Sequence, residues 1–157
     1  MLKFKWGFVL LTVLLLFGLL ISCSWAEPLL GEADGVISFT VGSLDFTVNG
    51  ENYLLDAAPY IKDGRTFIEI RHPAAALQIP EECLIWDNTE KSMTGTWEEN
   101  SIKMTIGSKI CWVNEVPYLM DVSPEIVNGR VMVPLRWAAE AMGAKVEWKD
   151  NVVTLTY

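Results

Sequence analysis

The sequence is poor in the residues from which most catalytic and metal sites are built. Of its 157 residues one is a histidine, His72, and three are cysteines. Zinc and copper sites need several nitrogen or sulfur ligands, and a Ser-His-Asp arrangement would have to use the same histidine. The sequence also lacks a Gly-x-Ser-x-Gly turn, a phosphate-binding glycine loop and a calcium loop. We therefore expect no catalytic residue, no metal and no cofactor, and we interpret His72 as a solvent-facing residue.

Basic residues are also scarce. The chain has 12 lysines and arginines against 20 aspartates and glutamates, which gives a formal net charge of −8. Nucleic acids and anionic lipid surfaces would repel such a chain, so we do not expect them as partners. The simplest role of the negative charge is solubility.

The only long apolar run lies at the N-terminus. Lys3 and Lys5 precede a run over residues 6–21, and Ala26 is a small residue at a cleavage position, so residues 1–26 are predicted to be a signal peptide. An alternative is a bacterial lipoprotein signal, in which Cys23 takes the lipid and becomes the new N-terminus. An uncleaved anchor is disfavoured because the run is short for a membrane span. We expect an exported chain that touches the membrane only through this segment or a lipid anchor.

Two cysteines remain beyond this segment. A disulfide between Cys83 and Cys111 would close 28 residues (111 − 83) and is permitted outside the cytoplasm. Alternatively, Cys111 is a small apolar core residue, because it takes the place of Phe46 when the two halves of the chain are aligned. The sequence leaves both interpretations open.

The two halves of the chain share a pattern, because six residues recur after 65 positions. We interpret the pattern as two tandem repeats over residues 36–108 and 109–157. The recurring pairs are Asn49 and Asn114, Asp56 and Asp121, Pro59 and Pro124, Gly64 and Gly129, Arg65 and Arg130, and Arg71 and Arg136.

Each repeat alternates short β-type runs with turn signals and contains one short helix. Asn49-Gly50, Asp63-Gly64 and Asn128-Gly129 supply the positive φ that a tight hairpin turn requires. A helix is predicted from Leu135 to Met142, with Gly143 after its end. The predicted fold class is α+β: two tandem repeats, each a small antiparallel sheet packed on one short helix. Since neither copy is large enough for a good core, we expect side-by-side packing or a shared sheet.

The second repeat closely resembles the copper amine oxidase N-terminal-like domain, also called the stalk domain. The resemblance rests on Asp121, Pro124 and residues 128–136, 139–144 and 146–148, and the first repeat matches more loosely. It implies a small antiparallel sheet wrapped on a helix, found mainly in exported proteins of Gram-positive bacteria. It implies no amine oxidation, because that chemistry belongs to a separate catalytic domain with a copper site of histidines and a tyrosine-derived quinone.

The recurring charged residues and two of the tryptophans have a structural interpretation. Each aspartate is expected to cap a turn, and each arginine to pair with it or with backbone carbonyls, holding a hairpin against the helix. Ligand contact is the alternative. Trp86 and Trp148 are expected in the core. The full set is Asp56, Arg65, Arg71, Trp86, Asp121, Arg130, Arg136 and Trp148.

Three other tryptophans are predicted to be exposed. Strand alternation turns Trp112 outward, Trp137 lies about 200° around the helix from Leu135, and Trp97 precedes a polar turn. Exposed indoles stack on sugar rings or bury against a protein, so these three are candidate ligand contacts. The alternative is that Trp137 or Trp112 seals the contact between the repeats.

These observations favour a non-enzymatic module of the cell envelope of a Gram-positive bacterium, acting as a scaffold or binding unit. Its expected partner is a cell-wall polysaccharide or an envelope protein. A second hypothesis is a regulator or inhibitor that docks on an exported enzyme. A wall hydrolase that uses paired carboxylates such as Glu98 and Glu99 is disfavoured, because such pairs act only across a shaped cleft.

Overall fold

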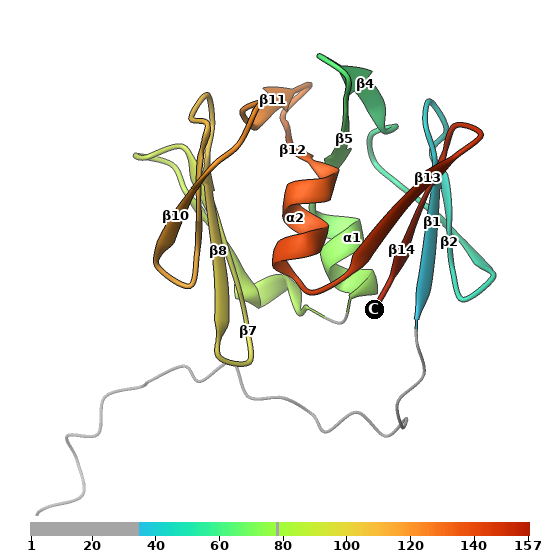
Figure 1. The fold of residues 1–157 in the computed structure, drawn as a ribbon, viewed down its shortest axis with the longest axis horizontal. Helices are drawn as coiled ribbons and strands as arrows, with labels where there is room; N and C mark the ends of the chain where they lie inside the picture. Colours follow the sequence, from blue (N-terminus) through green and yellow to red (C-terminus); the bar gives the residue numbers. More distant parts are fainter. Residues whose placement is uncertain (1–34, 78) are drawn as a thin grey trace, which may run out of the picture.

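The computed structural model describes residues 35–77 and 79–157, which form three antiparallel sheets around two short α-helices (Figure 1). The structure is mostly antiparallel sheet with two short helices, which agrees with the predicted α+β class. The predicted signal peptide, including Cys23, lies outside the described residues. Within those residues, no helix is both long enough and apolar enough to cross a membrane.

Sheet A combines strands from the two ends of the described chain. Its order is β13-β14-β1-β2-β3, and β1 pairs along its whole length with β14, from Val36 opposite Thr156 to Thr40 opposite Val152. The strands are β1 (Val36–Thr40), β2 (Asp45–Val48), β3 (Glu51–Leu54), β13 (Lys145–Lys149) and β14 (Val152–Thr156).

Sheet C stands on the other side of the molecule, with the helices between it and sheet A (Figure 1). Its order is β10-β9-β8-β7-β6. The strands are β6 (Leu84–Asp87), β7 (Ser92–Trp97), β8 (Asn100–Thr105), β9 (Ile110–Val113) and β10 (Val116–Leu119).

Sheet B closes the space above the helices in the view of Figure 1. Its order is β11-β12-β5-β4, and its central pair places Val133 opposite Ile68. The Glu125 carboxylate joins the two edges of this sheet, because it accepts hydrogen bonds from the Tyr60 hydroxyl at 2.6 Å and from Lys62 Nζ at 2.5 Å. The strands are β4 (Tyr60–Lys62), β5 (Arg65–Glu69), β11 (Glu125–Val127) and β12 (Arg130–Pro134).

The helices are α1 (Arg71–Ala76), α2 (Leu135–Ala141) and the 3₁₀ turn η1 (Glu81–Cys83). Pro134 precedes α2, and Gly143 follows it with a φ of +82°, so the predicted helix ends at the predicted glycine. Leu135, Ala138 and Ala139 form its buried face. α2 packs on β5, β12 and β13, and therefore on two sheets at once.

The main core lies where the three sheets face the helices. Ile37 and Leu155 come from sheet A, Ile68 and Val133 from sheet B, and Met104 from sheet C, and all five are at least 97% buried. Burial of one such side chain contributes about 1.5–3 kcal/mol to folding. The core thus depends on residues from the whole length of the described chain.

The predicted hairpin turns are confirmed. Asn49 and Gly50 have φ values of +52° and +85°, and Asn128-Gly129 and Asp63-Gly64 are also in the left-handed region. Asparagine and aspartate tolerate this region and glycine adopts it without steric cost, which is why these pairs connect adjacent strands.

The strand bounds repeat with the spacing seen in the sequence. β9, β10, β11 and β12 begin and end 65 residues after β2, β3, β4 and β5, as from Asp45 to Ile110. With this shift, β1, β2 and β3 of sheet A correspond to β8, β9 and β10 of sheet C, and β14 and β13 take the places of β7 and β6. Each of them joins strands from both halves of the chain, so the structure has the shared sheets that the small size of each half favours rather than one separate sheet in each half.

Candidate binding groove

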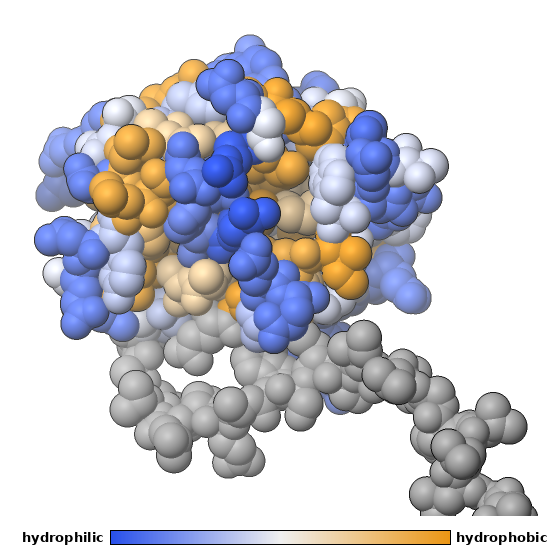
Figure 2. Space-filling model, turned by 180° about the vertical axis from the view of Figure 1, so that it is seen from behind, coloured by the Kyte–Doolittle hydropathy of each residue, from blue (hydrophilic) through white to orange (hydrophobic). Residues whose placement is uncertain are grey.

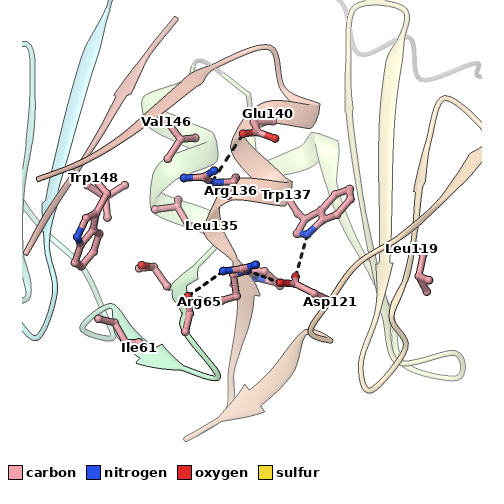
Figure 3. Close-up of a pocket in the computed structure, with 14 residues that line it drawn as sticks. Ile61, Arg65, Leu119, Asp121, Leu135, Arg136, Trp137, Glu140, Val146 and Trp148 are labelled. Carbon is pink, nitrogen blue, oxygen red and sulfur yellow. Dashed lines mark hydrogen bonds and ion pairs between the residues drawn. The ribbon is translucent and has the colours of Figure 1, made fainter.

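A groove of about 550 Å³ runs beside α2, at the place where the three sheets approach one another (Figure 3). Ile61 comes from β4, Arg65 from β5, Leu119 from β10, Trp137 from α2 and Trp148 from β13. Because these elements are distant in sequence, the groove exists only in the folded chain.

The walls of the groove are apolar. Trp148 and Ile61 lie on one side and Leu119 on the other, with Trp137 between them on α2 (Figure 3). Trp148 is 46% exposed and Leu119 is 76% exposed. Exposed apolar side chains gathered around a hollow are typical of surfaces that bind a ligand or a partner.

The floor of the groove carries two ion pairs. Arg65 Nε donates to Asp121 Oδ2, and Trp137 Nε1 donates to Asp121 Oδ1 at 3.4 Å. Partial burial would raise the pKa of Asp121, but the hydrogen bonds from Arg65 and Trp137 outweigh it, so this pKa lies below the ordinary value. Arg136 Nε lies 3.9 Å from Glu140 Oε1, which leaves most of its guanidinium donors available to a ligand.

A second ion pair of the same kind joins Arg130 to Asp56 at 2.8 Å. Both residues are the 65-residue counterparts of Arg65 and Asp121. These arginines therefore pair with aspartates, but the expected partner within the same repeat is wrong, because each pair bridges the two halves of the chain. The recurring Arg71 pairs instead with Glu81 at 3.3 Å.

The family model of the copper amine oxidase N-terminal domain matches residues 32–80 and 47–157. The chain belongs to this family. No curated protein and no solved structure matches it. The copper amine oxidase N-terminal domain is a non-catalytic accessory domain, so membership agrees with the expectation of a chain that is not an enzyme.

The groove of this copper amine oxidase N-terminal domain protein contains one of the three tryptophans predicted to contact a ligand. Trp137 is there, half-buried against the main core. Trp112 is 42% exposed, as predicted, but it lies on the outer face of sheet C. Trp97 is half-buried, as Trp137 is, so neither is as exposed as predicted. Trp97 shares the inward face of β7 with Met93 and packs against the core.

The expectation that Trp86 and Trp148 are core residues is also wrong. They are 37% and 46% exposed. Both stand on edge strands, β6 and β13, opposite the inward-facing residues Met93 and Val153. Their indoles therefore point to the inner side of a sheet but have no neighbouring strand on one side. Because of this edge position, the indole of Trp148 lines the groove.

The Cys83–Cys111 bridge is not formed, because Cys111 is a free and fully buried thiol. Burial raises the pKa of Cys111 to about 11, so the thiol is neutral at ordinary pH. The alternative interpretation, a small core residue in the place of Phe46, is confirmed.

His72 is not the solvent-facing residue that the sequence suggests. Its Nδ1 lies 2.6 Å from Oε2 of Glu69, which is 4% exposed, and its ring meets Phe46 edge-on. The imidazole thus satisfies a buried carboxylate. In the described part of the chain, no three histidine, cysteine or acidic residues come together as metal ligands. Glu98 is a turn residue between β7 and β8, with a φ of +48°.

The opposite face of the molecule differs from the groove face. There α1 takes the place of α2, and His72 stands at the 65-residue counterpart of Trp137. Seen from that side, a band of hydrophilic residues runs down the middle of the molecule between apolar patches (Figure 2). The two faces share a backbone plan but present different side chains.

Ile61 and Leu119 were not found by sequence reasoning. Each is an apolar residue in a short strand next to a turn. Many core residues have the same sequence surroundings, so the sequence does not distinguish them. The repeat shows that Ile126 and Leu54 are their counterparts, and all four are exposed, but only the tertiary structure reveals this.

Proposed function

We propose that the chain is two copies of the family domain that exchange their last two strands. Hairpin β6–β7 follows α1 but completes sheet C with β8, β9 and β10, while hairpin β13–β14 follows α2 and completes sheet A. Because β8 then corresponds to β1, the copies meet in the turn at Glu98 and Glu99 rather than after residue 108.

We further propose that this protein is a non-catalytic binding module of the cell envelope, and that its groove holds a cell-wall glycan. The observation that carries the proposal is the meeting of Trp137 and Trp148 with Arg136, Glu140 and Asp121 in one open groove. An indole stacks on the apolar face of a sugar, while planar carboxylates and guanidinium groups bond to its hydroxyls.

Titration with soluble wall glycans, followed by tryptophan fluorescence, tests this function. Trp148→Ala should weaken binding by up to about tenfold, since one stacked ring contributes on the order of 0.5–1.5 kcal/mol. Trp86→Ala is the matched control, because it removes the counterpart tryptophan from β6, outside the groove. Absence of binding, or equal loss in both variants, would contradict the glycan proposal.

Export to the envelope is part of the same proposal. It is supported by the predicted signal peptide over residues 1–26, with either cleavage after Ala26 or lipid on Cys23. Mass spectrometry of the mature N-terminus distinguishes the two. A full-length intracellular chain would overturn the proposal.

A second candidate function is docking on an exported protein as a regulator or inhibitor. Trp112 favours it, because this exposed indole lies outside the groove on a sheet face. A pull-down from envelope extract tests it. Docking is supported over glycan binding if the parent chain recovers one protein in stoichiometric amount and the Trp112→Ala variant does not.

A further inference from the structure

The four edge strands of the two five-stranded sheets are not equally protected against pairing with another strand. They are β13 and β3 in sheet A, and β6 and β10 in sheet C. An exposed edge offers unpaired backbone N–H and C=O groups, and proteins block it with charges, proline or bulges.

Three of these edges carry such a block. β13 has charged residues at Lys145, Glu147 and Lys149, so every second side chain repels an apolar strand. β10 contains Pro117, which cannot donate a backbone hydrogen bond. β3 begins with Glu51 and Asn52, both exposed.

The edge strand β6 has no block over its first three residues, Leu84, Ile85 and Trp86. Ile85 is 58% exposed and Trp86 is more than one third exposed. Within the described residues β6 pairs only with β7. β6 takes the same edge position in sheet C that β13 takes in sheet A, so this position in the fold is charged on one sheet and apolar on the other.

We propose that β6 pairs antiparallel with β6 of a second copy of this chain and joins the two sheets C into one ten-stranded sheet. A two-fold axis normal to the sheet keeps the outer faces together and pairs the strand with itself. Ile85 then faces Ile85 of the second copy, and Leu84 faces Trp86. A sheet of about ten strands lies within the range that twisted sheets adopt.

The sequence of β6 favours a second copy as the occupant, because this register is self-complementary. Every cross-strand pair among the three residues is apolar, and aromatic and β-branched pairs of this kind stabilise antiparallel strands. Asp87 is the charged residue of the strand. In this register it lies opposite residue 83 of the second copy and not opposite the Asp87 of that copy. No like charges therefore meet within the paired strands.

Sedimentation velocity of the mature protein tests the proposal. We expect a dimer that dissociates on dilution, and Ile85→Lys should raise its dissociation constant about tenfold or more, because it places two ammonium groups opposite each other. The matched control is Glu147→Lys, which makes the same residue at the counterpart position of β13 and should leave the dimer unchanged.

A cross-link supplies a second readout. Ile85→Cys should give a disulfide-linked dimer under oxidation, whereas Glu147→Cys should not, and the buried native thiol of Cys111 should not react. A monomer at concentrations up to about 500 µM would overturn the proposal, since even a weak interface associates there. A dimer that survives Ile85→Lys but is lost with Trp112→Ser would also overturn it, by placing the contact on the sheet face. These outcomes do not depend on whether the groove binds glycan.

Discussion

Sheets A and C are built from five corresponding strands in the same arrangement, but the side chains on their inner and outer faces differ. The inner face of sheet A carries the stacked rings of Phe39 and Phe46, whose centroids lie 5.3 Å apart. Their counterparts in sheet C are Met104 and Cys111, which are also buried. One backbone plan is therefore filled by two different sets of core side chains.

The outer faces differ in polarity. The central row across sheet A is polar throughout, whereas the same row across sheet C includes apolar residues. The row in sheet A is Glu147, Thr154, Ser38, Thr47 and Asn52, and the row in sheet C is Ile85, Thr94, Lys103, Trp112 and Pro117. The polar row of sheet A shows that folding requires no apolar residue at these outer positions.

The largest expected change in the free energy of unfolding comes from substitutions on the inner faces of sheets A and C. Phe46→Ala removes a ring stacked on Phe39 and touching His72 and should reduce the free energy of unfolding by about 3–5 kcal/mol. Cys111→Ala, at the counterpart position, removes a single sulfur atom and should cost about 1 kcal/mol. Urea unfolding followed by tryptophan fluorescence measures both. Equal costs would mean that the two inner faces are packed alike.

The next effect concerns the two bridging ion pairs. Asp121 accepts hydrogen bonds from Arg65 and Trp137, and its counterpart Asp56 pairs with Arg130. Asp121→Asn should cost about 1 kcal/mol and Asp56→Asn about 0.5 kcal/mol, because the pairs are partly exposed and solvent screens them. Thermal unfolding distinguishes the two, and a larger loss in Asp56→Asn would reverse the comparison.

Much of the fold could be predicted from local sequence. Asn-Gly and Asp-Gly fix the hairpins, and Gly143 fixes the end of α2, because positive φ is a local requirement. The sequence does not reveal β1, nor which sheet hairpins β6–β7 and β13–β14 join. These depend on pairings such as Val36 with Thr156, and no local pattern encodes a partner that far along the chain.

The candidate site was harder to predict than the fold. Trp97 and Trp148 both precede a polar turn in the sequence. Trp97 is on an inner strand of sheet C and packs inward, whereas Trp148 is on an edge strand and opens to the groove. Exposure here depends on the order of strands in a sheet. The strand order places hairpin β6–β7 in sheet C and hairpin β13–β14 in sheet A, and the sequence does not show this placement.

Acidification should weaken the contact that Glu125 makes between the two edge strands of sheet B. Hydrogen bonds from Lys62 and Tyr60 lower the pKa of Glu125, although partial burial opposes them. The folded pKa is below the unfolded one, so this group stabilises the protein above its unfolded pKa and the stabilisation is lost as the pH falls through the folded pKa. The loss on acidification should be about 0.5 kcal/mol, because the carboxylate is partly solvated.

Thermal unfolding of the parent and of Glu125→Gln at neutral and acidic pH isolates this contribution. The variant should lose less stability on acidification than the parent. Tyr60 is the 65-residue counterpart of Glu125, so the bond joins unlike residues across sheet B and has no second copy to compensate for its loss.

The smallest effect on stability should come from the outer face of sheet C. Trp112→Thr introduces the residue that Thr47 provides at the counterpart position of sheet A, and it should change the free energy of unfolding by less than about 0.5 kcal/mol. The same variant should bind less of a fluorescent dye for apolar surfaces than the parent. A cost above about 1 kcal/mol would show that the indole is held by intramolecular packing. A small cost would show that folding does not require an indole at this place, as the docking proposal expects.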